Sequence, residues 1–160
     1  MKRYMHRLET NGPNSLIGLL EILEDIGKPT DIAKLDDSLD EERTMLMNLL
    51  DDAESLKLIE ISNGDVSITE TGRKFLGSSI EQRKKLLHSL VKDVEPFHTL
   101  IAYFNTLNTK EVPKDDVGRY LNEVFPPGQS DDTLKILLNW GRYTKLFTYD
   151  SDIGNIVLKD

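Results

Sequence analysis

Histidines are the side chains most often used for proton transfer and metal binding near neutral pH, and this chain has three. His6, His88 and His98 form no HExxH motif. His88 and His98 fall on different predicted helices, without an obvious set of carboxylate ligands in front of them. We therefore expect no metal site.

Nucleophiles and phosphate-binding loops are equally hard to find. The chain has no cysteine, which excludes disulfides, thiolate metal ligands and cysteine nucleophiles. Ser78-Ser79 lacks the GxSxG context of a nucleophile elbow, and the glycines form neither GxxxxGK[ST] nor GxGxxG. The many Asp and Glu residues are spread over predicted helix surfaces. The sequence predicts a protein that is not an enzyme and binds no cofactor.

Two features could instead serve binding. The densest basic cluster could contact an acidic partner surface or simply keep a helix solvated, and we favour the second interpretation; it comprises Arg73, Lys74, Arg83, Lys84 and Lys85, with Lys92 nearby. Trp140 stands beside Gly141, a pairing typical of close helix packing. We therefore expect the indole in the core and not against a ligand.

The overall charge argues against nucleic acid as a partner. The net charge is −8 and the pI is about 4.9, which opposes attraction to a phosphate backbone. The helix that would enter the major groove in the first half offers Arg43 and Lys57 against six acids, so a phosphate would meet net repulsion there; the acids are Asp40, Glu41, Glu42, Asp51, Asp52 and Glu54. Its counterpart in the second half is less acidic, but its cations are sparse: Lys135, Arg142 and Lys145.

The elements of the first half follow from apolar spacing. Leu16, Leu19, Leu20 and Leu23 repeat at helical intervals after a candidate cap at Asn14 or Ser15, and Gly27 ends the pattern. Thr30 is a candidate cap for a short second helix. A third helix has a predicted apolar face formed by Met45, Leu46, Leu49, Leu50, Ala53 and Leu56. Residues 58–69 then read as a hairpin turning at Asn63-Gly64.

The second half repeats this order. Ser79 and Gln82 are placed to cap a linking helix over residues 80–91, and Pro96 precedes three further helical stripes, the first of which includes Leu107. A second hairpin closes the chain. The predicted fold class is mainly α with small β-hairpins (α+β), in tandem winged-helix-like units at 14–76 and 96–160 joined by a connecting helix at 77–95. A single fused domain is the alternative.

Several stretches resemble a known family. The run from Leu138 to Asp150, LNWGRYTKLFTYD, resembles the terminal signature of the AAA-associated domain, a C-terminal appendage of nitrate, sulfonate and taurine-type ABC transporter ATPases. Residues 15–23 resemble the family's opening helix and residues 66–75 its wing exit, so the resemblance spans about 13–158. It implies a packing and interface role for the signature residues Trp140, Gly141, Arg142, Tyr143, Phe147 and Tyr149.

The resemblance also implies a function. Such modules are cytosolic, are fused behind a nucleotide-binding domain, and are expected to regulate ATP hydrolysis or to sense a signal. The expected partner is an ABC transporter ATPase subunit or another protein; the alternative is a winged-helix DNA-binding transcription regulator. No signal peptide or run of about twenty apolar residues is present, so we expect a cytoplasmic protein without direct membrane insertion. A homodimer is possible. The chain is either a stand-alone protein or a fragment of a larger ATPase.

Overall fold

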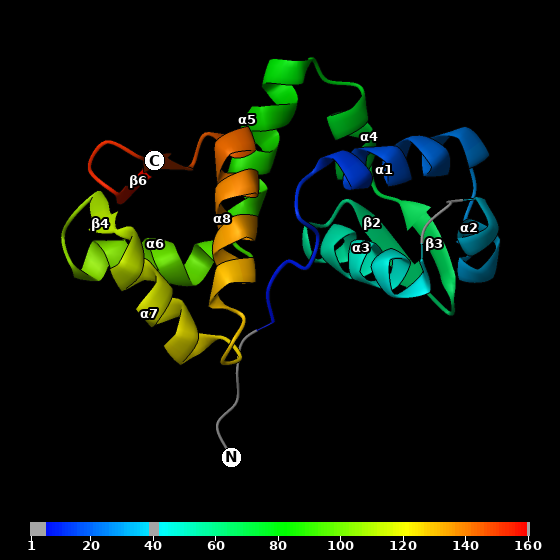
Figure 1. Ribbon diagram of the computed structural model, residues 1–160. Coiled ribbons are helices and arrows are strands. Elements are labelled where there is room, and N and C mark those ends of the chain that lie inside the picture. Colours follow the sequence, from blue (N-terminus) through cyan, green and yellow to red (C-terminus); the bar gives the residue numbers. More distant parts are fainter. Residues whose placement is uncertain (1–5, 39–41, 160) are drawn as a thin grey trace. The chain divides into compact units, whose positions relative to one another are not determined.

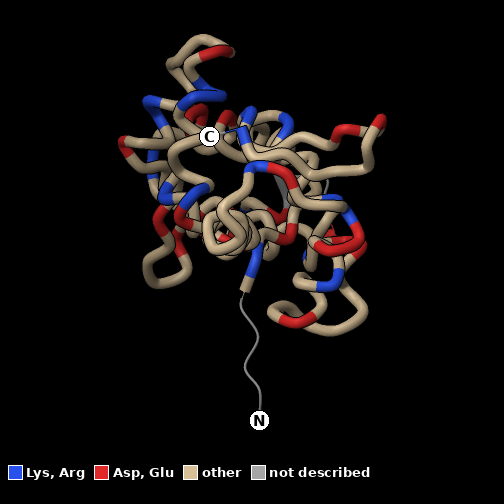
Figure 2. The backbone as a smooth tube through the Cα atoms, turned by 90° about the vertical axis from the view of Figure 1, so that its left-hand side faces the viewer, with Lys and Arg blue, Asp and Glu red and all other residues tan. Residues whose placement is uncertain are grey.

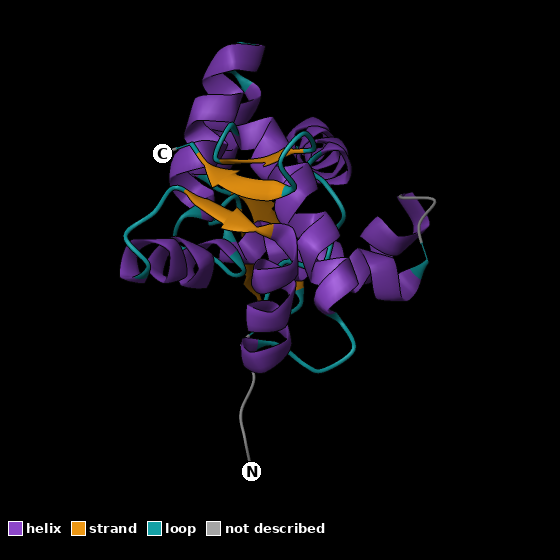
Figure 3. Cartoon of the chain, turned by 60° about the vertical axis from the view of Figure 1, so that its left-hand side comes forward, coloured by secondary structure: helices purple, strands orange, loops and turns teal. Residues whose placement is uncertain are grey.

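The computed structural model describes residues 6–38 and 42–159. Helices make up most of the chain, and the strands form two small antiparallel sheets (Figures 1 and 3). The chain divides into two compact units. We call them unit N, which spans residues 12–86, and unit C, which combines residues 6–11 with 87–159. The predicted class, mainly α with small hairpins, is confirmed.

Unit N is built from a helical subdomain and a hairpin. Its elements in chain order are α1 (Asn14–Ile26), β1 (Thr30–Asp31), α2 (Ile32–Ser38), α3 (Arg43–Ser55), β2 (Ile59–Ser62), β3 (Asp65–Ile68), α4 (Glu70–Leu76) and the first half of α5 (Ile80–Val91). The strand order is β1-β3-β2, with Thr30 opposite Val66 and Ile61 opposite Val66 on the other side. Asn63 and Gly64 both have positive φ, as a two-residue hairpin turn requires, so the predicted turn is confirmed.

The core of unit N is aliphatic. The four leucines predicted for the first helix are all buried, and α1 ends where Gly27 adopts a left-handed conformation (φ 72°), as predicted. The predicted caps were wrong: Pro13 precedes α1 without a side-chain cap, and Thr30 lies in β1. The Asp31 carboxylate instead accepts a hydrogen bond from the Ala33 amide at the start of α2.

One residue that was predicted to lie on the buried face of α3 is exposed. Leu46, Leu49, Leu50, Ala53 and Leu56 are buried, but Met45 is 55 % exposed. The buried set recurs at intervals of three and four residues and already fills the face that packs on α1 and β2, so Met45 falls at its edge.

Unit C has the same element order. Its helices and strands are the second half of α5, α6 (Phe97–Thr106), β4 (Glu111–Pro113), α7 (Lys114–Val124), α8 (Ser130–Thr144), β5 (Phe147–Asp150) and β6 (Asn155–Leu158). The strand order is β4-β6-β5, so in both units the short first strand pairs with the last one. The predicted repeat of element order is therefore present. The winged-helix assignment remains an interpretation of this order.

Aromatic rings join the parts of the unit C core. Phe104 meets Phe147 edge to face, with ring centroids 5.4 Å apart, and Phe97 lies 6.1 Å from the same ring. Leu107, predicted in the α6 stripe, is 49 % exposed because it is the residue that caps α6, beyond the packed turns.

The N-terminal segment, residues 6–11, belongs to this core although α1 to α4 follow it in sequence. Leu8 is buried, and its amide donates to the Glu95 carbonyl. The Trp140 indole N–H donates to the Thr10 carbonyl at 2.8 Å, and Arg7 donates to the Gln129 side chain. These contacts tie the segment to unit C.

The capping of α5 was predicted correctly, since the Ser79 hydroxyl accepts from the Gln82 amide while the Gln82 side chain accepts from the Ser79 amide. The division between the units falls inside this helix, at residues 86 and 87. The boundaries 14–76, 77–95 and 96–160 stay predictions. Within residues 6–38 and 42–159, no helix is long and apolar enough to cross a membrane.

Candidate interaction site

The three histidines either form a structural hydrogen bond or lie at the surface. His88 Nδ1 lies 2.8 Å from the Thr144 carbonyl, to which it donates, and His6 and His98 are exposed. In the part of the chain that the structure describes, no three His, Asp or Glu side chains are grouped so that they could hold a metal ion.

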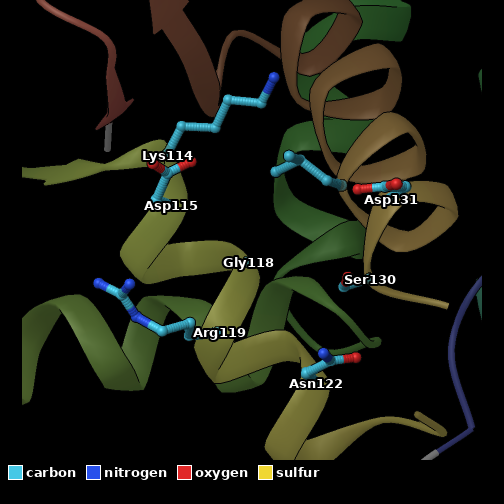
Figure 4. Close-up of a pocket in the computed structure, with 8 residues that line it drawn as sticks. Lys114, Asp115, Gly118, Arg119, Asn122, Ser130 and Asp131 are labelled. Atoms are coloured by element: carbon cyan, nitrogen blue, oxygen red, sulfur yellow. The ribbon is translucent and has the colours of Figure 1, made fainter. Parts of the chain in front are cut away.

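A shallow hollow with polar side chains lies between α7 and α8 of unit C (Figure 4). Its lining mixes charges, with Lys114 and Asp115 at the start of α7 and Asp131 at the start of α8. Arg119 also lines it, but its guanidinium is paired with Asp116 and points away from Asp131 (Figure 4). Opposed charges in an open, solvated hollow favour no particular ligand.

The signature residues separate into buried and exposed sets. Trp140, Gly141 and Phe147 are buried, as the expected packing role requires. A Cβ added at Gly141 would lie 2.8 Å from the Phe147 Cβ and 3.0 Å from its carbonyl oxygen. The start of β5 therefore reaches α8 only because position 141 has no side chain.

The other signature residues reach the surface of unit C. Arg142 and Tyr149 are exposed and Tyr143 is half-buried. Lys114 lies over the Tyr149 ring, 5.5 Å from its centroid. An acidic partner for Arg142 is not found among the ion pairs of the described residues. The interface role of these three residues stays a prediction.

A stacked tyrosine pair was not predicted from the sequence. Tyr103 of α6 and Tyr120 of α7 stack with ring centroids 4.0 Å apart and an interplanar angle of 11°. Partial burial raises the pKa of Tyr103 above its ordinary value, and the negative charge of Asp116 raises it further. Tyr120, like Tyr103, is half-buried.

The predicted basic cluster is largely engaged within unit N. Arg83 donates to the carbonyls of Phe75 and Leu76 at the end of α4, and its guanidinium lies 5.5 Å from the Phe75 ring centroid. Arg73 pairs with Glu24 of α1, and Lys84 pairs with Glu81. Lys74 and Lys85 are exposed. Arg73, Arg83 and Lys84 therefore hold α4 and α5 in place through contacts within unit N, and the positive charges of the cluster are not gathered on one surface of the described residues.

The outer surface of α3 is different, because it presents apolar and acidic side chains together. Met47 is 39 % exposed, and Asp51 and Glu54 follow it on the same side of the helix at intervals of four and three residues. Met45 lies on the other side of the helix, about 160° around its axis from Met47, so it does not belong to this stripe. We call Met47, Asp51 and Glu54 the α3 face. The sequence had identified its acids, but not the exposure of Met47.

The surroundings of the α3 face carry the same sign of charge. Residues 12–69 contain fourteen Asp and Glu against four Lys and Arg, so the acidic excess of the chain is concentrated there. The β2–β3 hairpin adds exposed Glu60 and Asp65 and no Lys or Arg. Elsewhere along the chain, acidic and basic positions are interspersed (Figure 2). A phosphate backbone would meet repulsion at both the helix and the hairpin of unit N.

Comparison with known proteins places the chain in a family. A model of the C-terminal AAA-associated domain matches residues 33–150, which covers all of α3 and the whole of the signature run. This agrees with the resemblance predicted from the sequence. No curated protein matches the chain significantly, and neither does any solved structure. The family is associated with ABC transporter ATPases. The match covers more than half of the chain, and the chain therefore belongs to the C-terminal AAA-associated domain family.

Proposed function

We propose that this chain is a non-catalytic regulatory module that binds the ATP-binding subunit of an ABC transporter of the nitrate, sulfonate or taurine type in the cytoplasm. Family membership over residues 33–150 is the observation that carries the proposal. One feature of the chain supports it: the outer surface of α3 in unit N presents acidic and apolar side chains that a partner protein could contact. The ATP-binding subunit then hydrolyses ATP, and the module changes the rate or the timing of hydrolysis.

The proposal is tested by mixing the full chain with the purified ATP-binding subunit of such a transporter from the same genome. Isothermal titration calorimetry measures binding, and release of phosphate measures the rate of ATP hydrolysis with and without the chain. We expect saturable binding and a rate of hydrolysis that changes with the same concentration dependence. The absence of both effects for every ATP-binding subunit of this type in the genome would overturn the proposal.

A winged-helix DNA-binding regulator is the second candidate, because the element order of both units fits it. Charge opposes it, since the surfaces that would meet DNA in unit N are acidic. Titration of random-sequence duplex DNA at low salt separates the two functions. We expect no binding; salt-sensitive binding that is lost when Lys135 and Arg142 are replaced would favour the regulator instead.

A further inference from the structure

We propose that the groove of unit C that holds residues 6–11 also takes the same segment from a second copy of this chain, so that two copies exchange their N-terminal segments and form a homodimer. We call residues 6–11 the strap. The proposal goes beyond the function proposed above and does not depend on it, because the contacts that carry it lie within unit C.

Unit C binds the strap as an extended peptide. No residue of the strap belongs to a helix or strand. The Leu8 amide donates to the Glu95 carbonyl at 2.8 Å, and the Thr10 carbonyl accepts from the Trp140 indole at 2.8 Å. The Leu8 side chain itself is buried, with 2 % of the residue exposed. Proteins recognise extended peptides by this combination of backbone hydrogen bonds and a pocket for a side chain. The groove therefore recognises a short sequence, whichever copy of the chain supplies it.

Arg7 fixes the direction of the strap in the groove. Its guanidinium donates to the side chain of Gln129, just before α8, whereas Thr10 is bonded in the second half of that helix. The Arg7 side chain is 6 % exposed, yet its Nε has no hydrogen-bond partner among the described residues. A buried donor without a partner costs free energy, and release of the strap returns this group to water. The strap therefore binds in one direction but can leave its seat.

The connection between the strap and unit N can act as a hinge. The chain bends at residues 10–12, and a Cβ built at Gly12 would meet no atom within 4 Å. Asn11 beside it is exposed. Proline at position 13 disfavours helical backbone at Gly12 and favours an extended one. Asn11 and Gly12 can therefore straighten without loss of packing, and a straightened hinge carries the strap away from its own unit C.

Exchange between two copies preserves the contacts of the strap. Identical grooves receive identical segments, so a dimer of this kind needs no new surface. Along the chain, residues 12–86 separate the strap from the rest of unit C. A long intervening segment raises the entropic cost of closing the groove with the chain's own strap. A strap from a neighbouring copy therefore competes better as the chain becomes more concentrated.

The first experiment asks whether the groove takes the strap from outside. The probe is a labelled peptide of residues 6–13, and its control is the same peptide with Leu8→Asp. In the full chain, Leu8→Asp places a carboxylate in the pocket and empties the groove. Leu107→Asp, at a leucine of the same unit that is 49 % exposed, is the matched control. Binding is measured by fluorescence anisotropy.

We expect the Leu8→Asp chain to bind the peptide at least about tenfold more tightly than the wild type or Leu107→Asp, whose grooves are filled. The control peptide should bind at least about tenfold more weakly than the probe. Leu8→Ala is the second variant, since it loosens the strap without burying a charge, and should bind the probe with intermediate affinity. Circular dichroism and the fluorescence of Trp140 verify that each variant is folded.

The second experiment measures the exchange itself. The wild type is unfolded in urea and refolded at increasing concentrations, and light scattering after size-exclusion chromatography gives its mass. We expect a dimer whose fraction rises with the concentration during refolding and falls when excess peptide is present. Leu107→Asp should retain this dimer and Leu8→Asp should lose it. A wild type that is monomeric at every concentration, a dimer that Leu8→Asp retains, or equal binding of probe and control peptides would overturn the proposal.

Discussion

Replacing Gly141 by alanine sets two opposite effects against each other in α8. Alanine favours a helix over glycine by about 1 kcal/mol. The added Cβ, however, would lie 2.8 Å from the Phe147 Cβ and 3.0 and 3.2 Å from its backbone oxygen and nitrogen. Backbone atoms cannot rotate away as a flexible side chain can, so the overpacking cost falls at the upper end of its range, about 3 kcal/mol. We expect Gly141→Ala to lower the free energy of unfolding by about 2 kcal/mol.

The matched control is Gly118→Ala in α7 of the same unit. A Cβ at Gly118 has no atom within 4 Å, so only the helix preference remains and we expect a gain of about 1 kcal/mol. Urea unfolding followed by the fluorescence of Trp140, the single tryptophan, reports the stability of unit C for both variants. If Gly141→Ala were as stable as the wild type or more so, the close approach of β5 to α8 would be refuted.

Three further outcomes follow from contacts described above. Arg83→Lys should destabilise unit N by about 1 kcal/mol in urea unfolding, because an ammonium cannot reproduce the planar contacts with two carbonyls, whereas Lys74→Ala, at an exposed lysine of α4, should have little effect. The pKa of Tyr103 is raised in the folded chain, so the protonated phenol contributes to the free energy of unfolding. This contribution is complete below the ordinary pKa of 10.0 and is lost as the pH rises through the raised pKa. Asp116→Asn should lower the pKa of Tyr103, as measured by an ultraviolet absorbance titration. Trp140→Phe should lower the free energy of unfolding by about 1–3 kcal/mol, because it removes the hydrogen bond from the indole N–H to the Thr10 carbonyl; urea unfolding followed by circular dichroism measures this, and an unchanged free energy would contradict it.

Much of the helical framework could be predicted because its signals are local. The leucines of α1 recur at intervals of three and four residues, Asn63-Gly64 specifies a tight hairpin turn, and Ser79 with Gln82 forms a capping box. Each signal acts between residues close in sequence, so neighbouring side chains alone determine it. The predicted repeat of element order rested on these signals.

The remaining features depend on contacts between residues that lie far apart in the sequence. The strands β1 and β4 have two and three residues, too few for a pattern, and exist because β3 and β6 offer them hydrogen bonds. Met45 fits the α3 pattern, but its exposure depends on where α1 and β2 end their coverage. Arg83 reads as a solvated cation until its contacts with the end of α4 are known. The acids of α3 could therefore be identified from the sequence, but the exposure of Met45 and Met47 could not.

The discontinuity of unit C has a consequence for biosynthesis. A ribosome releases residues 12–86 as one uninterrupted stretch, so unit N can collapse as soon as that stretch emerges. Residues 6–11 leave the ribosome before unit N does. The Thr10 carbonyl can accept its hydrogen bond from Trp140 only after α8 is made, because Trp140 lies 130 residues later in the chain. Until then Leu8 has no core to enter. During translation the hydrogen bond between Thr10 and Trp140 therefore forms only after unit N has been made and α8 is complete.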